Sequence, residues 1–251
     1  MADKQEKIES SDIKLTSSNK SLLWLDNFWF YHKWKVIVIA FFAIVAVVGI
    51  VQMVNKEDPD VEVTVATHTI YYAEQVDSLE KTLLSLMPSD INGDGKKNVQ
   101  INLYKIYSES ELKDANEAET DAGGNPVIYA DEEYNKSQIN QFNSYIMTGQ
   151  CSVMILSEYV YSELVNRRSD DILLTPVSEI FEGEMPKGVT SDGYGIRLTE
   201  TGAYKNLEAF RFLPDDSVIC IIRPFVMGGN VSAERHEAAV VFFKNIVEFG
   251  N

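Results

Sequence analysis

Residues 61–104 read VEVTVATHTIYYAEQVDSLEKTLLSLMPSDINGDGKKNVQINLY. Apolar and β-branched side chains alternate with polar ones in residues 61–67 and again in residues 99–104, which predicts two β-strands. Between them, apolar residues recur every three or four positions over residues 71–87, which predicts an amphipathic helix that ends before Pro88. A strand, a helix and a strand in this order are typical of a crossover unit with parallel strands. We therefore expect a mostly parallel α/β domain.

The same alternation continues to the end of the chain. Residues 151–156 and 217–222 are continuous apolar runs, which predict strands buried on both faces, and residues 194–198 predict a shorter strand. Residues 108–135 are acidic and weakly patterned, so we expect an irregular surface excursion with one short strand at residues 127–129. Helical spacing is present in four further segments, residues 137–147, 158–168, 203–210 and 233–249.

A transmembrane helix is predicted ahead of this domain. Residues 36–54 read VIVIAFFAIVAVVGIVQMV and contain no charged side chain. At about 1.5 Å per residue they span about 29 Å, close to the hydrocarbon thickness of a bilayer. Because the polar lead-in is long and no small-residue cleavage site follows, we expect an uncleaved signal anchor.

The flanks of this helix predict its orientation. Lys33 and Lys35 precede it and acidic residues follow it, so the N-terminus is expected in the cytoplasm and the domain outside the cell membrane. Trp24, Trp29 and Trp34 lie just before the helix, where indole rings and lysines are expected to anchor it at the membrane interface. The predicted organisation has four parts: a disordered tail at 1–20, an aromatic juxtamembrane segment at 21–35, the transmembrane helix at 36–54 and the extracytoplasmic domain at 55–251.

Composition excludes one class of partner and leaves others open. The chain has 38 acidic and 22 basic residues and a net charge of −16, which repels phosphate backbones. We therefore expect no nucleic acid as a partner. The hydrophobic share of 45% is that of an ordinary folded protein.

The most specific motif is a nine-residue loop that matches the first part of a calcium-binding loop. Oxygen-bearing side chains stand at positions 1, 3, 5 and 9 and glycine stands at position 6, and the candidate ligands are Asp90, Asn92, Asp94, Lys96 and Asn98. The acidic ligand expected at the twelfth position is missing, because Ile101 stands there. A structural calcium ion is one interpretation, and a metal-free turn built on Asn-Gly and Asp-Gly is the other.

Motifs for catalysis are few. His68 follows a predicted strand and His236 lies in the last predicted helix as a solvated residue, and neither has a metalloprotease spacing. Cys151 and Cys220 fall in apolar strands, where two buried thiols are expected; a disulfide would require the two strands to be neighbours with Cα atoms within about 7 Å. We therefore expect a protein that is not an enzyme and that needs no cofactor, structural calcium apart.

Two segments are candidates for the rim of a binding site. Thr69, Tyr71 and Tyr72 follow the first predicted strand, and Gly228, Gly229 and Asn230 follow the strand at residues 217–222. Ligands of open α/β sheets bind beyond the carboxyl ends of strands, where hydroxyls and aromatic faces are available to them. The alternative is that Tyr72 caps the core and that the glycines only turn the chain.

The order of these segments resembles the first lobe of extracytoplasmic solute-binding proteins of Gram-positive bacteria. The resemblance includes residues 61–87, the loop from Asp90 to Lys96, the sequence Met147-Thr148-Gly149-Gln150 before an apolar strand, and the terminal strand and helix. It implies one lobe of a type II periplasmic-binding-protein fold. Family members usually exceed 300 residues and have two lobes, so the resemblance implies a shortened, membrane-anchored relative.

Two functions are compatible with these features. The first is a non-catalytic, membrane-anchored binding protein for a small solute or surface ligand. The second is an assembly protein, whose outer domain or membrane segment contacts another protein through residues 108–135 or 24–34.

Overall fold

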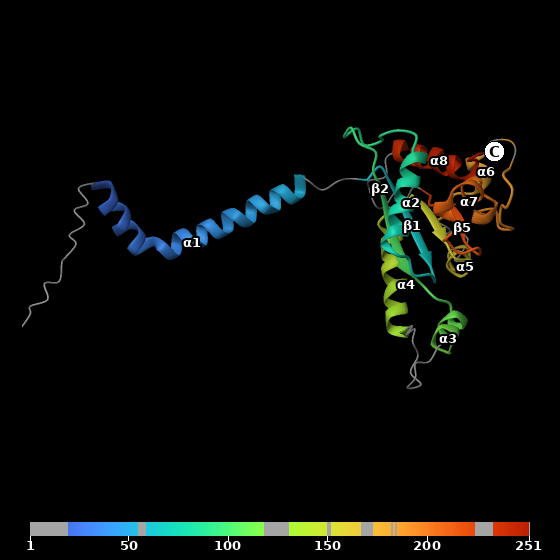
Figure 1. Ribbon diagram of the computed structural model, residues 1–251, viewed down its shortest axis with the longest axis horizontal. Coiled ribbons are helices and arrows are strands. Elements are labelled where there is room, and N and C mark those ends of the chain that lie inside the picture. The colour runs from blue at the N-terminus through green and yellow to red at the C-terminus, as the bar shows by residue number, and fades with distance from the viewer. Residues whose placement is uncertain are drawn as a thin grey trace, which may run out of the picture. The chain divides into compact units, whose positions relative to one another are not determined.

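The structure is a computed structural model with two compact units, residues 1–57 and residues 58–251. Figure 1 shows both units, and each is described by itself. The described residues are 20–54, 59–117, 131–149, 152–166, 173–181, 183, 185–223 and 233–250.

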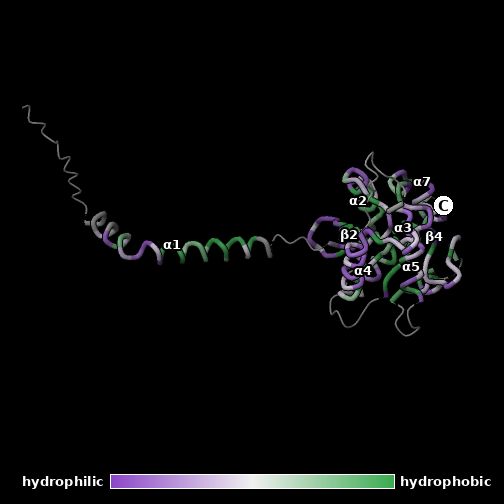
Figure 2. Tube along the Cα trace, turned by 90° about the horizontal axis from the view of Figure 1, so that it is seen from below, coloured by the Kyte–Doolittle hydropathy of each residue, from purple (hydrophilic) through white to green (hydrophobic). Residues whose placement is uncertain are grey.

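The described residues of the first unit form the helix α1 (Lys20–Val54), which includes the predicted aromatic segment as well as the predicted transmembrane helix. Its stretch Asn27–Val51 is long and apolar enough to cross a membrane, and none of the most apolar part is buried against protein. Figure 2 shows hydrophobic residues along the second half of α1. A single N-terminal apolar helix, consistent with a membrane anchor, is therefore present.

The second unit is built on one five-stranded sheet in the order β2-β1-β3-β5-β4. β1 pairs in parallel with β2 and β3, and β5 pairs antiparallel with β3 and β4, so four strands run in one direction. The prediction of a mostly parallel α/β domain is confirmed. The strands are β1 (Val61–Thr67), β2 (Val99–Lys105), β3 (Val153–Leu156), β4 (Gly195–Arg197) and β5 (Val218–Ile221).

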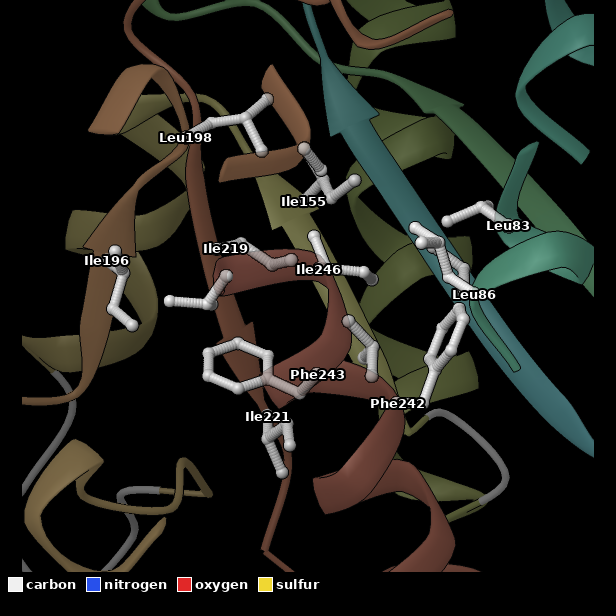
Figure 3. Close-up of a cluster of buried hydrophobic side chains, with 14 of the residues drawn as sticks. Leu83, Leu86, Ile155, Ile196, Leu198, Ile219, Ile221, Phe242, Phe243 and Ile246 are labelled. Carbon is white, nitrogen blue, oxygen red and sulfur yellow. The ribbon is translucent and has the colours of Figure 1, made fainter. Parts of the chain in front are cut away.

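Helices cover both faces of the sheet (Figure 1). α2 (Ala73–Leu86) and α8 (Ala233–Val247) pack on one face, where Leu83 and Phe243 join side chains of β1, β3 and β5. Figure 3 shows Phe242, Phe243 and Ile246 of α8 among them. α4 (Glu132–Met147) and α5 (Glu158–Val165) cover the opposite face, where alternate strand residues form a second cluster with Phe142. Side chains that point alternately to the two faces explain why β3 and β5 are apolar throughout.

Residues 108–135 differ from the prediction at their start. They contain a helix, α3 (Glu109–Glu117), where an irregular excursion was expected, and the predicted strand at 127–129 lies outside the described residues. The helix is acidic and mostly solvated, so it lacks the apolar stripe that marks a helix in sequence. The expected helix at 203–210 is divided into α7 (Gly202–Asn206) and a 3₁₀ turn, Glu208–Phe210.

The remaining short elements are α6 (Val177–Ile180) and the 3₁₀ turn Leu198–Glu200. Cys220 is buried in β5 as predicted, whereas Cys151 lies outside the described residues. His236 was expected to be solvated but is half-buried in α8, and burial lowers the pKa of its imidazole.

Candidate functional site

The carboxyl ends of β1 and β3 lie next to each other, because these parallel strands pair from Val63 with Val153 to Ala66 with Leu156. The chain passes from β1 to β2 through α2 on one face, and from β2 to β3 through α3 and α4, with α4 on the other. Ligands of open α/β sheets bind where the connections diverge in this way, outside the carboxyl ends of the strands. Polar residues at this edge are therefore candidates for a functional site.

His68 and Glu111 meet at this edge. His68 directly follows β1, and Nδ1 of its imidazole lies 3.0 Å from Oε1 of Glu111 in the first turn of α3. About one third of each side chain is exposed, so both are accessible from solvent while held by the fold.

A pair of reciprocal hydrogen bonds fixes the carboxylate of Glu111. The backbone N–H of Ser108 donates to Oε2 of Glu111 at 2.7 Å, and the backbone N–H of Glu111 donates to Oγ of Ser108 at 3.2 Å. This is a capping box, which satisfies backbone donors in the first turn of a helix. It uses one carboxylate oxygen and leaves Oε1 facing His68.

Asp216 is the third member of the cluster. It stands two residues before β5, and its Oδ2 accepts a hydrogen bond from the backbone N–H of Glu158, the first residue of α5, at 3.4 Å. One ligand atom from each of His68, Glu111 and Asp216 lies within 4.8 Å of the others. An imidazole nitrogen with two carboxylate oxygens is a ligand set used for Zn²⁺ and similar ions.

Two polar atoms in this region have no hydrogen-bond partner among the described residues. Nδ1 of His68 is buried, and its contact with Glu111 lacks hydrogen-bond geometry although it has ion-pair distance. Oγ of Ser217, next to Asp216, is also buried without a partner. Buried polar atoms usually have a hydrogen-bond partner, so these two atoms show that hydrogen-bonding groups remain unused at this edge of the sheet.

Tyr71 lies beside the cluster as a neutral phenol. Its hydroxyl is 2.6 Å from Oγ1 of Thr67, and its ring contacts that of Phe212. Burial raises the pKa of Tyr71 to about 12; hydrogen bonds from Thr67 and Thr69 oppose this, and the charge of Asp216 adds to it. The side chain can therefore bind a ligand through its hydroxyl or ring, but it does not ionise near neutral pH.

The predicted rim residues separate in the structure. Thr69 and Tyr71 are partly buried at the edge of the sheet, whereas Tyr72 is 74% exposed and its backbone N–H donates to Gln75 at the start of α2. Tyr72 therefore does not cap the core. The helix predicted over residues 71–87 begins later than expected, because α2 starts at Ala73 and Tyr72 is its N-cap. Gly228, Gly229 and Asn230 lie outside the described residues.

A solvent-open hollow of about 640 Å³ adjoins Glu111. It is lined by Ser108, Glu109, Ser110, Lys113, Asp114, Tyr159 and Glu163. Burial raises the pKa of Tyr159, and the charges of Glu163, Glu109 and Glu111 raise it further. The surroundings of the cluster are therefore anionic and favour a cation over an anion.

The loop predicted to bind calcium is folded by its own hydrogen bonds. Oδ1 of Asp90 accepts the N–H of Gly93 at 2.8 Å, and Oδ2 accepts the N–H of Gly95 at 2.7 Å. Asn92 and Asp94 likewise accept from the backbone two residues ahead, at 2.9 and 2.8 Å. Because each oxygen has two lone pairs, these bonds leave capacity for a cation. Lys96 is exposed and Asn98 is partly buried where the loop enters β2.

The predicted interface residues all lie on α1. Trp24, Trp29 and Trp34 are each more than half exposed. The rings of Trp24, Phe28 and His32 follow one another at helical spacing, with centroids 5.4 and 4.9 Å apart. Lys33 lies with its ammonium 6.0 Å from the ring of Phe30, and Lys35 is also exposed. Aromatic and basic side chains on one helix end are suited to the head-group region of a bilayer.

Sequence reasoning noticed His68 but missed Glu111 and Asp216, two among 38 acidic residues. A signal existed for Glu111, because Ser108-Glu109-Ser110-Glu111 has the spacing of a capping box. None existed for Asp216, whose role depends on the pairing of β5 with β3. Comparison of the chain with known protein families, curated proteins and solved structures finds no match.

Proposed function

We propose that this chain is a single-pass, membrane-anchored binding protein, whose extracytoplasmic α/β domain takes a small ligand at the carboxyl edge of its sheet without chemical change. The observation that carries the proposal is the gathering of His68, Glu111, Asp216 and Tyr71 at the switch of the chain between β1 and β3. These groups come from positions far apart in the sequence and meet where ligands of such sheets bind.

Three further features support this proposal. The apolar helix α1 has basic residues before it and acidic residues after it, which favours an N-terminus in the cytoplasm and the domain outside. The mostly parallel α/β sheet with helices on both faces is an architecture in which ligands bind at the carboxyl ends of strands. Tyr71 stays protonated near neutral pH, so it suits binding better than proton abstraction.

The test is ligand-dependent melting of the full chain in nonionic detergent, followed by circular dichroism. The probes are sugars, amino acids, short peptides and divalent metal salts. A bound ligand at one hundred times its Kd stabilises the folded state by about 2.7 kcal/mol. Tyr71→Phe should reduce the shift given by an organic ligand. Tyr72→Phe is the matched control, because Tyr72 points to solvent beside the site.

A shift that is equal in the wild type and in Tyr71→Phe places the ligand elsewhere on the chain. If no probe raises the melting temperature of a cooperatively unfolding chain, the small-ligand proposal is wrong. The alternative, an assembly protein that contacts a partner through residues 24–34 or 108–135, then becomes the better one.

A further inference from the structure

We propose that His68, Glu111 and Asp216 form a binding site for a divalent transition-metal ion such as Zn²⁺. The inference rests on the proposed function, because it names the chemical class of ligand taken at the same edge. It concerns a different place and a different ion from the calcium loop at Asp90.

The three side chains converge from separate elements, and both carboxylates are held in orientation. The three residues come from the end of β1, the first turn of α3 and the turn before β5. Each carboxylate is held by a backbone N–H, Glu111 by that of Ser108 and Asp216 by that of Glu158. Outer hydrogen bonds of this kind orient metal ligands and are part of how metal sites work.

The second argument is the unsatisfied imidazole. Nδ1 of His68 is buried, has no hydrogen-bond partner among the described residues and lies 3.0 Å from Oε1 of Glu111. At this separation a proton or a cation must lie between the nitrogen and the carboxylate oxygen. A metal ion bound to both atoms would take the place of that proton.

The third argument is the ligand set. One nitrogen and two carboxylate oxygens are suited to Zn²⁺, Co²⁺ or Mn²⁺, whereas Ca²⁺ and Mg²⁺ prefer oxygen alone. With metal–ligand bonds of about 2.0–2.2 Å, tetrahedral ligands lie about 3.3 Å apart. The three ligand atoms lie within 4.8 Å of one another, and all three side chains are partly exposed. Side-chain rotations that move the ligand atoms by on the order of 1 Å would bring them to the separations of a bound metal ion.

Three protein ligands leave a fourth position open, as in zinc sites that receive water or a further ligand. The surrounding charge agrees with a cation, because Glu109 and Glu163 line the adjoining hollow. One basic side chain, that of Lys113, also lines this hollow. The two carboxylate ligands are negatively charged and have acidic neighbours, and together these charges lower the free energy of a bound divalent cation.

The test is titration of the untagged full chain in nonionic detergent with ZnCl₂ after removal of metals by chelator. We expect saturable binding of one ion, measured by calorimetry. Co²⁺ should give visible d–d absorption without the strong thiolate band that cysteine ligation produces.

Variants assign the site. His68→Gln and Asp216→Asn should each weaken Zn²⁺ binding by about 100-fold. His236→Gln is the matched histidine control on α8, and Asp90→Asn is the control for the calcium loop; neither should change the affinity. Circular dichroism without metal shows that each variant is folded, and Asp216→Asn keeps the test open if His68→Gln does not fold.

The proposal is overturned if the wild type shows no saturable Zn²⁺ binding, or if folded His68→Gln and Asp216→Asn bind as the wild type does. It is also overturned if His236→Gln removes the binding. If Zn²⁺ does not bind but an organic ligand binds and needs Tyr71, the metal site alone is overturned. Failure of both overturns the proposed function as well.

Discussion

The carboxylate of Asp60 accepts a hydrogen bond from the backbone N–H of Asn98 at 2.8 Å and so ties the start of β1 to the start of β2, 38 residues later. It also accepts the N–H groups of Ile91 and Asn92, at 2.7 and 2.8 Å. Asp60 is only 3% exposed, so these three bonds are sheltered from water. The loop before β2 is therefore anchored by a residue outside it.

Replacement of Asp60 by alanine should destabilise the α/β domain by about 3 kcal/mol, because it orphans three backbone donors that the carboxylate now satisfies. Urea unfolding followed by circular dichroism measures this loss. Asp77→Ala is the control, since Asp77 is exposed on α2 and its loss should change the free energy of unfolding by about 0.5 kcal/mol or less. Equal stabilities of the two variants would contradict the anchoring role.

Gly202 lies where α7 meets the end of α8. A Cβ at this position would stand 2.0 Å from the backbone oxygen of Phe249. Gly202→Ala should therefore lower the free energy of unfolding by about 3 kcal/mol or more, because backbone has to move. The comparison variant is Lys205→Ala on the same helix, whose solvent-exposed ion pair with Glu200 should contribute little to the free energy of unfolding. An alanine at 202 without cost would show that the two helix ends are further apart.

Acid should destabilise the domain through His236. Burial lowers the pKa of this imidazole from its usual 6.5. The folded state therefore binds fewer protons than the unfolded state, and stability is lost as the pH falls from about 6.5 through the lowered pKa. His236→Gln should remove this part of the slope, measured as urea unfolding at several values between about pH 5 and 7.5. Parallel stability curves for wild type and variant would contradict the prediction.

Calcium binding by the loop from Asp90 to Asn98 stays a proposal with its own test. Because Ile101 replaces the twelfth ligand, the affinity should be weak, with Kd about 10⁻⁴–10⁻³ M. We expect 10 mM CaCl₂, roughly ten or more times that Kd, to raise the melting temperature of the wild type but not of Asp90→Asn or Asp94→Asn. A chelator should leave the wild type folded, since hydrogen bonds close the loop. An equal rise in all three chains would place calcium elsewhere.

Topology can be tested with reporters fused after residue 251. If the basic flank holds the N-terminus in the cytoplasm, as proposed, alkaline phosphatase should be active there and green fluorescent protein dark. Changing Lys33 and Lys35 to glutamate should shift part of the population to the reverse orientation. The opposite pattern of reporter activity in the wild type would place the α/β domain in the cytoplasm.

Much of the fold followed from periodicity in the sequence. The first strand was predicted with the bounds of β1, Val61–Thr67, and the helix before Pro88 has Leu79, Leu83 and Leu86 buried as its stripe required. Helix α3 was missed because its acidic surface has no apolar stripe, and its start depends on the hydrogen bonds between Ser108 and Glu111. Patterning predicts what buries an apolar face, and it does not register an exposed helix.

The candidate site also contains residues that the sequence predicted and residues that it did not. Tyr71 and Thr69 were found because a position after a strand is a local feature, whereas Tyr72 was included by proximity and points to solvent. Glu111 could have been marked only by its capping-box spacing to Ser108, and Asp216 had no signal that separates it from the other acids of the surface. Their meeting with His68 requires the strand order and the register of β5 on β3.

The sequence by itself determined the apolar N-terminal helix, the alternation of strands and helices, and the mostly parallel sheet, because hydrophobic patterning is local and repeated over many residues. Only the tertiary structure decided that β5 runs antiparallel between β3 and β4, and that His68, Glu111 and Asp216 come together. The physical reason is that single polar contacts between distant segments depend on how strands are ordered and paired. That order is set by packing of the whole core and leaves no trace in any one segment.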